Sequence, residues 1–174
     1  MSKRIGFFRK SRNSNKELVA LFEEIQKIRA DSTDKDWGNK DFVKNLTSLE
    51  KKASGKIIQL LKNKKLKTAD DFYRAAFIFH HRKNFKSYLT ATALAAISNH
   101  LGEPWGKNLY AVALDRLLLS IGLPQQFGTQ YIKKRGKYKL APFNQNTKDE
   151  EREKYLVEPL TKLKAREKEL NKKN

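Results

Sequence analysis

Two adjacent charged residues, Asp115 and Arg116, lie inside an otherwise apolar stretch that runs from Leu109 to Leu119. Consecutive residues of an α-helix point about 100° apart, so a helix with apolar residues on every side would bury at least one of the two charges. Removing one partner of a buried ion pair costs about 3–5 kcal/mol, and we therefore expect each charge to have a partner. Three interpretations stay open: a polar network that fixes the helix to the following loop, a ligand-binding or catalytic site, and exposure of the charges to solvent.

The segment that follows this stretch is rich in amide groups. Gln125, Gln126, Thr129 and Gln130 lie within six residues of one another. An amide both donates and accepts hydrogen bonds, so these side chains could satisfy a buried ion or orient a polar ligand; an amide-rich turn without a ligand is the alternative. With the charged pair and one histidine they predict a polar pocket, whose ligand-binding residues would be His81, Asp115, Arg116, Gln125, Gln126, Thr129 and Gln130.

The histidines raise the question of a metal site or a catalytic base. His80 and His81 end one predicted helix, and His100 ends another. Adjacent histidines on a helix cannot both face one ion, and the sequence has neither an HxxxH nor an HExxH spacing, so we expect no metal. We expect no cofactor either. His81 and Asp115 could still form a general base with its orienting carboxylate, as a hydrolase or transferase would need.

A second candidate surface is a short basic segment near the C-terminal third of the chain. Its basic and aromatic residues are Lys133, Lys134, Arg135, Lys137, Tyr138 and Lys139. Cationic groups bind phosphates, and an aromatic ring can stack on a base, so the segment fits a nucleic-acid partner. A solvated basic turn is the alternative interpretation.

Charge and composition set the broad class of the protein. The 174 residues include 38 Lys and Arg against 19 Asp and Glu, a formal net charge of +19, and no cysteine. Residues 1–70 and 131–174 hold most of the charge, whereas residues 71–130 are nearly neutral. The charge fits a polyanionic partner, and the excess of lysine over arginine also fits an AT-rich genome. Disulfides and thiolate metal sites are excluded, and no apolar run approaches the roughly 20 residues of a membrane span.

Helical spacing of apolar residues predicts six helices, at about 15–30, 40–63, 68–81, 85–100, 104–121 and 148–170. Ser14 to Glu17 and Thr147 to Glu150 are typical of capping boxes, and Pro159 should break the last helix near Glu158. Residues 123–146 predict an irregular segment or a short hairpin. We therefore predict an all-α, single-domain bundle or short helical array in the cytoplasm, with a basic arm at 1–13, a helical domain at 14–165 and a charged tail at 166–174.

Several of these residues form an ordered signature. Ala76–His81 is followed by Tyr88-x-x-Ala91-x-x-Leu94-Ala95, by Ala113-x-Asp115-Arg116-x-Leu118 and by Gly122-x-Pro124-Gln125-x-Phe127-Gly128-Thr129-Gln130. The order resembles a bacterial family of uncharacterised all-helical domains with a Gln-His pair, a later Asp-Arg and a G-x-P-Q-x-(F/Y)-G-T-Q segment. The likeness covers roughly residues 17–163 and includes Arg152, while His80 stands where the family more often has Gln. The resemblance implies the helical fold and a convergence of His81, Asp115, Arg116, Gln125, Thr129 and Gln130; it implies no reaction.

Three functions are compatible with these observations. The first is a binding module whose polar pocket holds a small polar or anionic molecule or a peptide, with Arg116 as the partner of an anion. The second is a nucleic-acid-associated protein that uses the basic flanks. The third is a hydrolase or transferase with His81 as general base and Asp115 as its orienting residue.

Overall fold

The computed structural model describes residues 13–172, which fold into eight helices and one two-stranded hairpin. The helices are α1 (Lys16–Asp31), α2 (Asp34–Gly38), α3 (Lys40–Lys62), α4 (Ala69–His80), α5 (Phe85–His100), α6 (Gly106–Ser120), α7 (Asp149–Lys154) and α8 (Leu160–Lys172), and the strands are β1 (Tyr131–Lys134) and β2 (Lys137–Leu140). The all-α fold class with a short hairpin is confirmed. Most of the predicted basic arm, residues 1–12, lies outside the described residues.

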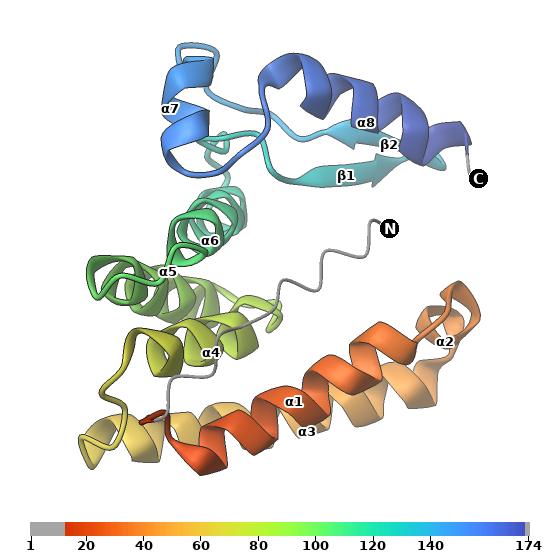
Figure 1. Ribbon diagram of the computed structural model, residues 1–174. Helices are drawn as coiled ribbons and strands as arrows, with labels where there is room; N and C mark the ends of the chain where they lie inside the picture. Colours follow the sequence, from red (N-terminus) through yellow and green to blue (C-terminus); the bar gives the residue numbers. More distant parts are fainter. Residues whose placement is uncertain (1–12, 173–174) are drawn as a thin grey trace.

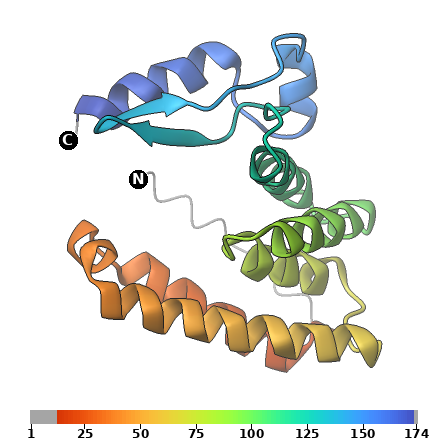
Figure 2. The same cartoon turned by 180° about the vertical axis from the view of Figure 1, so that it is seen from behind.

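The helices are stacked in sequence order. The long helices α1 and α3 lie side by side at one end, α4, α5 and α6 follow as successive layers, and the hairpin with α7 and α8 forms the other end (Figure 1). The view from behind shows that the two ends extend in the same direction from the central helices (Figure 2). The chain is therefore a short helical array rather than a bundle around one axis.

Helix α6 is shared by two hydrophobic cores. Leu109 and Ala113 face the larger core, which α1, α3, α4 and α5 also supply. Ala111 faces a smaller core, with Phe127, Val157 and Leu163. We expected α6 to be buried on every side, and that expectation is wrong in part because most of its remaining apolar side chains are only half-buried. Because α6 contributes residues to both cores, it fixes the smaller core to the larger one.

The first helix begins differently from the predicted capping box. Asn15, not Ser14, is the N-cap of α1, and its side chain accepts the backbone N–H of Leu18. The Ser14 hydroxyl instead donates to Asp70 at 2.7 Å, and the backbone N–H of Asn15 donates to Asp71 at 2.7 Å. Both carboxylates are buried in the first turn of α4. A tertiary contact thus replaces the local cap that the sequence predicted.

The C-terminal segment confirms one prediction and corrects another. The predicted helix is broken before Pro159, with α7 on one side and α8 on the other. Thr147 does not cap α7; its hydroxyl donates to the carbonyl of Gln126 instead. Within the predicted charged tail, residues 166–172 continue helix α8, which lies against β2. Asn171 bonds to the backbone of Tyr138 through both its oxygen and its amide nitrogen.

The hairpin turn explains why two short, polar strands meet. Arg135 and Gly136 form a two-residue loop in which both have positive φ, +50° and +79°. This conformation is that of a type I′ turn, which matches the twist of paired strands. Lys134 and Lys137 are therefore paired across the turn, and Tyr131 is paired with Leu140 at the other end.

The close packing of α5 against α6 leads to a first testable prediction. A Cβ on Gly106 would lie 2.7 Å from the backbone nitrogen of Asn99 and 3.0 Å from its Cα. Because backbone cannot move aside cheaply, Gly106→Ala should lower the free energy of unfolding by about 1–3 kcal/mol in urea titrations. Gly55→Ala is the matched control, since Gly55 lies within α3 with nothing within 4 Å of the added carbon. It should raise stability by about 0.5–1 kcal/mol, and equal effects of the two changes would contradict the packing described.

Candidate functional site

The carboxylate of Asp115 is the centre of the loop that follows α6. The residue is fully buried. Its Oδ1 accepts the backbone N–H groups of Gln126 and Phe127 at 2.7 and 2.9 Å, and its Oδ2 accepts the backbone N–H and the hydroxyl of Thr129 at 2.9 and 2.8 Å. Burial raises the pKa of Asp115, whereas the four hydrogen bonds act in the opposite direction. Because all four partners donate, the site is built for the ionised carboxylate.

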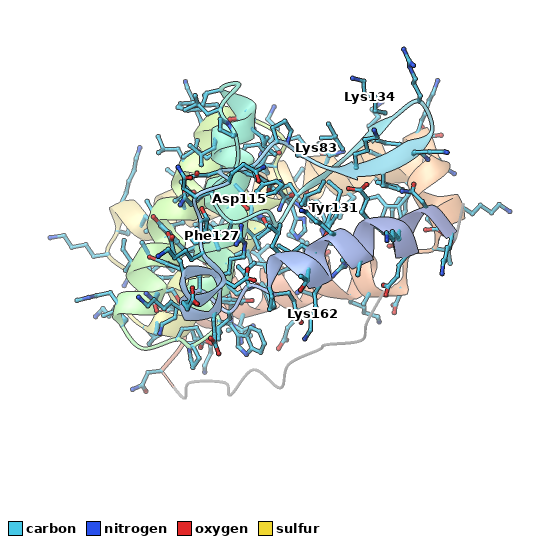
Figure 3. All side chains as sticks on the ribbon, turned by 90° about the horizontal axis from the view of Figure 1, so that it is seen from above. Lys83, Asp115, Phe127, Tyr131, Lys134 and Lys162 are labelled. Carbon is cyan, nitrogen blue, oxygen red and sulfur yellow. The ribbon has the colours of Figure 1, made fainter. Side chains whose placement is uncertain are left out.

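The local sequence explains how the loop returns to Asp115. Gly122 has a φ of +78° where the chain leaves α6, and Pro124 cannot continue the helix. Gly128 has a φ of +88°. In that left-handed conformation, which favours glycine, the loop curls so that N–H groups on both sides of Gly128 converge on one side chain. Figure 3 labels Asp115 and Phe127, which this curl brings into hydrogen-bond contact.

Arg152 holds the same loop through its carbonyl groups. The side chain is 1 % exposed. Its Nε donates to the carbonyl of Phe127 at 2.9 Å, and its Nη1 donates to the carbonyl of Thr147 at 2.7 Å and to Asp149 at 3.0 Å. The Asp115 carboxylate therefore accepts hydrogen bonds from the N–H groups of the loop, and the Arg152 guanidinium donates one to its Phe127 carbonyl. The sequence placed Arg152 within the family resemblance but did not predict this role.

The predicted amide residues hydrogen-bond to the protein itself. Gln125 is fully buried, and its Nε2 donates to the carbonyls of Gln130 and Ala141 at 3.1 and 3.0 Å while its Oε1 accepts the N–H of Gln130 at 2.8 Å. Gln126 donates to Thr147 at 3.0 Å and accepts from Asn144 at 3.2 Å. These contacts favour the structural network over a ligand pocket at the amide-rich loop.

Arg116 joins the loop to the end of α4. Its Nε donates to Oε1 of Gln130 at 2.9 Å, and its Nη1 donates to the backbone carbonyl of His80 at 2.8 Å. The Nε2 of Gln130 donates in turn to the hydroxyl of Thr129 at 2.8 Å. Both acceptors are neutral, so these hydrogen bonds do not balance the positive charge of Arg116, which acts on the two nearby histidines.

His80 and His81 form a pair of neutral imidazoles, of which His80 is buried and His81 half-buried. Their ring centroids lie 4.8 Å apart. Burial lowers the pKa of both rings well below the usual 6.5, and the charges of Arg116 and Arg29 lower it further. Nδ1 of His80 and Nε2 of His81 are buried and have no hydrogen-bond partner among the described residues. Two neutral imidazoles without partners, close to two guanidinium groups, are unusual in a protein interior.

The arrangement of a general base with an orienting carboxylate is not formed. Both oxygens of Asp115 are occupied by donors of the 126–129 loop, and no hydrogen bond joins Asp115 to His81 among residues 13–172. The structure therefore brings Asp115, Gln125, Gln126, Thr129 and Gln130 together around the loop, connects Arg116 to them, and leaves His81 apart.

His81 instead lines a pocket that the sequence did not predict. The pocket has a volume of about 290 Å³ and lies between α3 and the loop that joins α4 to α5. Its lining residues are Arg29, Trp37, Val43, Leu46, Thr47, Glu50, His81, Arg82, Lys83 and Asn84. Glu50 is buried and paired with Arg29, whose guanidinium lies 5.5 Å from the centre of the Trp37 ring. No spacing in the sequence indicates this pocket, because α1, α2, α3 and the α4–α5 loop each contribute to its lining.

A larger hollow, of about 520 Å³, lies beside α7 and α8. It is lined by Trp105, Asp149, Glu150, Glu153, Leu156, Val157, Glu158, Pro159 and Lys162. Asp149 accepts from Arg152 and from the backbone of Leu160, and Glu158 is paired with Lys162 at 3.1 Å. None of the predicted site residues lines this hollow.

The basic segment forms the exposed tip of the hairpin. Lys133, Lys134, Arg135, Lys137 and Lys139 are exposed and Tyr138 is half-buried. Lys134 extends away from the ribbon (Figure 3). The ammonium of Lys133 lies 5.3 Å from the centre of the Tyr138 ring, so one face of that ring is already covered by the protein.

Neither a cluster of metal-ligand side chains nor a membrane-spanning helix occurs among the described residues. Among residues 13–172, no three His, Asp or Glu side chains are placed together as metal ligands would be. In the same part of the chain, no helix has both the length and the apolar character of a membrane span.

The contacts of Asp115 predict a large effect of a minimal substitution. In Asp115→Asn an NH2 group replaces one carboxylate oxygen. Each oxygen accepts two hydrogen bonds, so two donors of the loop lose their acceptor. We expect the free energy of unfolding to fall by about 3 kcal/mol or more, measured in urea. Asp34→Asn removes an exposed carboxylate and should change it by no more than about 0.5 kcal/mol. A loss of less than about 1 kcal/mol at Asp115 would contradict the structural role of this carboxylate.

The histidine pair predicts a pH dependence of stability. Since both folded-state pKa values lie below 6.5, the unfolded chain takes up protons below about pH 6.5 that the folded protein does not. Stability should therefore fall as the pH decreases through this range, by up to about 1.4 kcal/mol per pH unit for each histidine. The slope should flatten in His80→Gln/His81→Gln and persist in the control His100→Gln, whose side chain is exposed. An unchanged slope in the double variant would refute this assignment.

Comparison with known proteins identifies no relative of this chain. No protein-family model matches the chain, and searches of curated proteins and of solved structures also found no match. The resemblance based on the Asp-Arg and GTQ signature therefore stays a prediction, and function has to be inferred from the arrangement of the side chains.

Proposed function

We propose that the protein is a binding module for a small anionic molecule and that the ligand occupies the pocket between α3 and the α4–α5 loop. The observation that carries the proposal is the half-buried His81 ring in the lining of a cationic pocket, with a buried Nε2 that has no partner among the described residues. The polar site expected around Asp115 is replaced by this neighbouring one, because the groups of that motif already bind one another.

The charge of the pocket favours an anion. Arg82 and Lys83 supply two positive charges, and the third, on Arg29, is balanced by Glu50, the one acidic residue of the lining. Asn84 is the N-cap of the 16-residue helix α5. The N-terminus of a helix carries a partial positive charge, and here it adds to the two side chains.

His81 and Trp37 would define the shape of the ligand. A neutral imidazole can donate or accept a hydrogen bond without adding charge, so His81 suits a polar group beside the anion. Trp37 is 39 % exposed and contributes an apolar wall together with Val43 and Leu46. The volume of about 290 Å³ is at the lower end for ligand pockets. A metabolite that combines one anionic group with a small planar or apolar part fits these features.

Nucleic-acid binding is the second candidate function. Its supporting observation is the exposed cationic tip of the hairpin, and no acidic residue occurs between Tyr131 and Lys148. The third hypothesis, a hydrolase or transferase, lost its support because Asp115 is not available to orient His81.

Thermal shifts with defined probes distinguish the two candidates. Adenosine monophosphate, citrate and inorganic phosphate should be titrated against the wild type, against Arg82→Gln/Lys83→Gln and against the control Lys107→Gln, which removes an exposed charge outside the pocket. We expect at least one probe to stabilise the wild type and the control, with about 2.7 kcal/mol at 100 times its dissociation constant, and the double variant to lose that stabilisation.

A single-stranded oligonucleotide is the contrasting probe. If it stabilises the protein at low salt and Lys134→Gln/Arg135→Gln removes the effect while Arg82→Gln/Lys83→Gln does not, the second candidate replaces the first. Equal responses of all variants to every small anion would show nonspecific attraction to a basic protein and would overturn the pocket proposal.

A further inference from the structure

Helix α5 has an apolar row that no other element of the described chain covers. Phe85, Leu89, Ala93, Ile97 and Leu101 follow one another at every fourth position. All five are exposed, and the four large side chains are 45, 49, 41 and 48 % exposed. The opposite side of α5 supplies Ala91, Leu94 and Ala95 to the larger core.

The composition of this helix is unlike that of a solvent-facing helix. No Lys, Arg, Asp or Glu occurs between Lys86 and Glu103, in a chain in which 33 % of the residues are charged. Helices at the surface of a globular protein ordinarily carry charged residues on the side that faces water. The absence of charge beyond Lys86 on the outer side of α5 therefore favours contact with protein.

The row is symmetric about its centre. Read from either end, it consists of two large residues, one small residue and two large residues, with Ala93 in the middle. Small neighbours, Thr90 and Ala96, lie one turn before and after Ala93, so two helices can approach closely there. Rows of residues spaced by four interdigitate when two helices cross at about −50°. A twofold axis near Ala93 would place Leu89 of one copy against Ile97 of the other.

Charge determines the relative direction of the two helices. The N-terminal end of α5 carries Arg82, Lys83 and Lys86, in addition to the positive end of the helix dipole. Parallel helices would bring two such ends together. Antiparallel helices place each of them beside the C-terminal end of the other copy, where Glu103 lies. From the symmetric row and this charge complementarity we infer that two copies of the chain associate through α5, antiparallel and about a twofold axis near Ala93.

The size of the contact sets the expected affinity. One helix from each copy makes an interface at the small end of the known range, below about 1,200 Å² in total. We therefore expect a reversible dimer with a dissociation constant on the order of micromolar. The dimer does not depend on the ligand proposed above.

Cysteine cross-linking tests the geometry directly, because the chain contains no cysteine. Ala93→Cys should form an intermolecular disulfide under mild oxidation at micromolar concentration. Leu89→Cys mixed with Ile97→Cys should form mainly the mixed dimer. Ile58→Cys, on α3, is the control at a comparably exposed apolar residue, 44 % exposed, and should cross-link slowly. Efficient homodimers of both Leu89→Cys and Ile97→Cys, without a preference for the mixed species, would indicate parallel helices and overturn the arrangement.

Sedimentation velocity over a range of concentrations tests the association itself. The wild type and Ile58→Glu should show the same concentration-dependent dimer, whereas Leu89→Glu should sediment as a monomer with a melting temperature within a few degrees of the wild-type monomer. A wild type that stays monomeric up to about 200 μM, far above the expected constant, would overturn the inference. So would a Leu89→Glu variant that dimerises as strongly as the wild type.

Discussion

The buried carboxylate of Asp115 is the constraint on which the arrangement of the two cores depends. Helix α6 faces the larger core with Leu109 and Ala113 and the smaller core with Ala111. Asp115 follows on the same helix and binds three N–H groups and one hydroxyl of the loop that leads to the hairpin. A loop held by a single buried charge can adopt few other positions, since any shift would leave that charge without partners. The smaller core is thereby fixed to α6.

Two arginines complete this constraint in different ways. Arg152 binds the carbonyl of Phe127 and brings the start of α7 to the loop, so the loop is held between a negative and a positive group. Arg116 makes no ion pair with Asp115 although the two are neighbours in sequence. It binds the Gln130 side chain and the carbonyl of His80. Burial lowers the pKa of the two imidazoles, and the positive charge of Arg116 lowers it further.

The sequence predicted the elements that depend on the local spacing of residues. It missed the features that form only when segments distant in sequence meet in the fold. Periodic apolar residues located the main helices, and Pro159 located the break before α8. The adjacent charges at 115 and 116 indicated a buried network, and the four hydrogen bonds of Asp115 form one. The predicted cap at Ser14 is wrong because Asn15 is the N-cap of α1, while the Ser14 hydroxyl donates to Asp70, which is distant in sequence. The pocket around His81 was not predictable in the same way, since Arg29, Trp37 and the α4–α5 loop meet only in the folded chain.

The polar network and the proposed pocket are connected through the end of α4. Arg116 binds the carbonyl of His80, the last residue of that helix, and the next residues along the chain are His81, Arg82 and Lys83, which line the pocket. A displacement of the 125–130 loop would move Arg116 and with it the backbone from which these three side chains extend. The Asp-Arg and GTQ residues would then support the proposed pocket, whereas binding would depend on His81, which also belongs to the signature, and on Arg82 and Lys83, which do not. If the proposed pocket binds a ligand, the GTQ loop would affect that binding without touching the ligand, because its side chains are engaged within the protein.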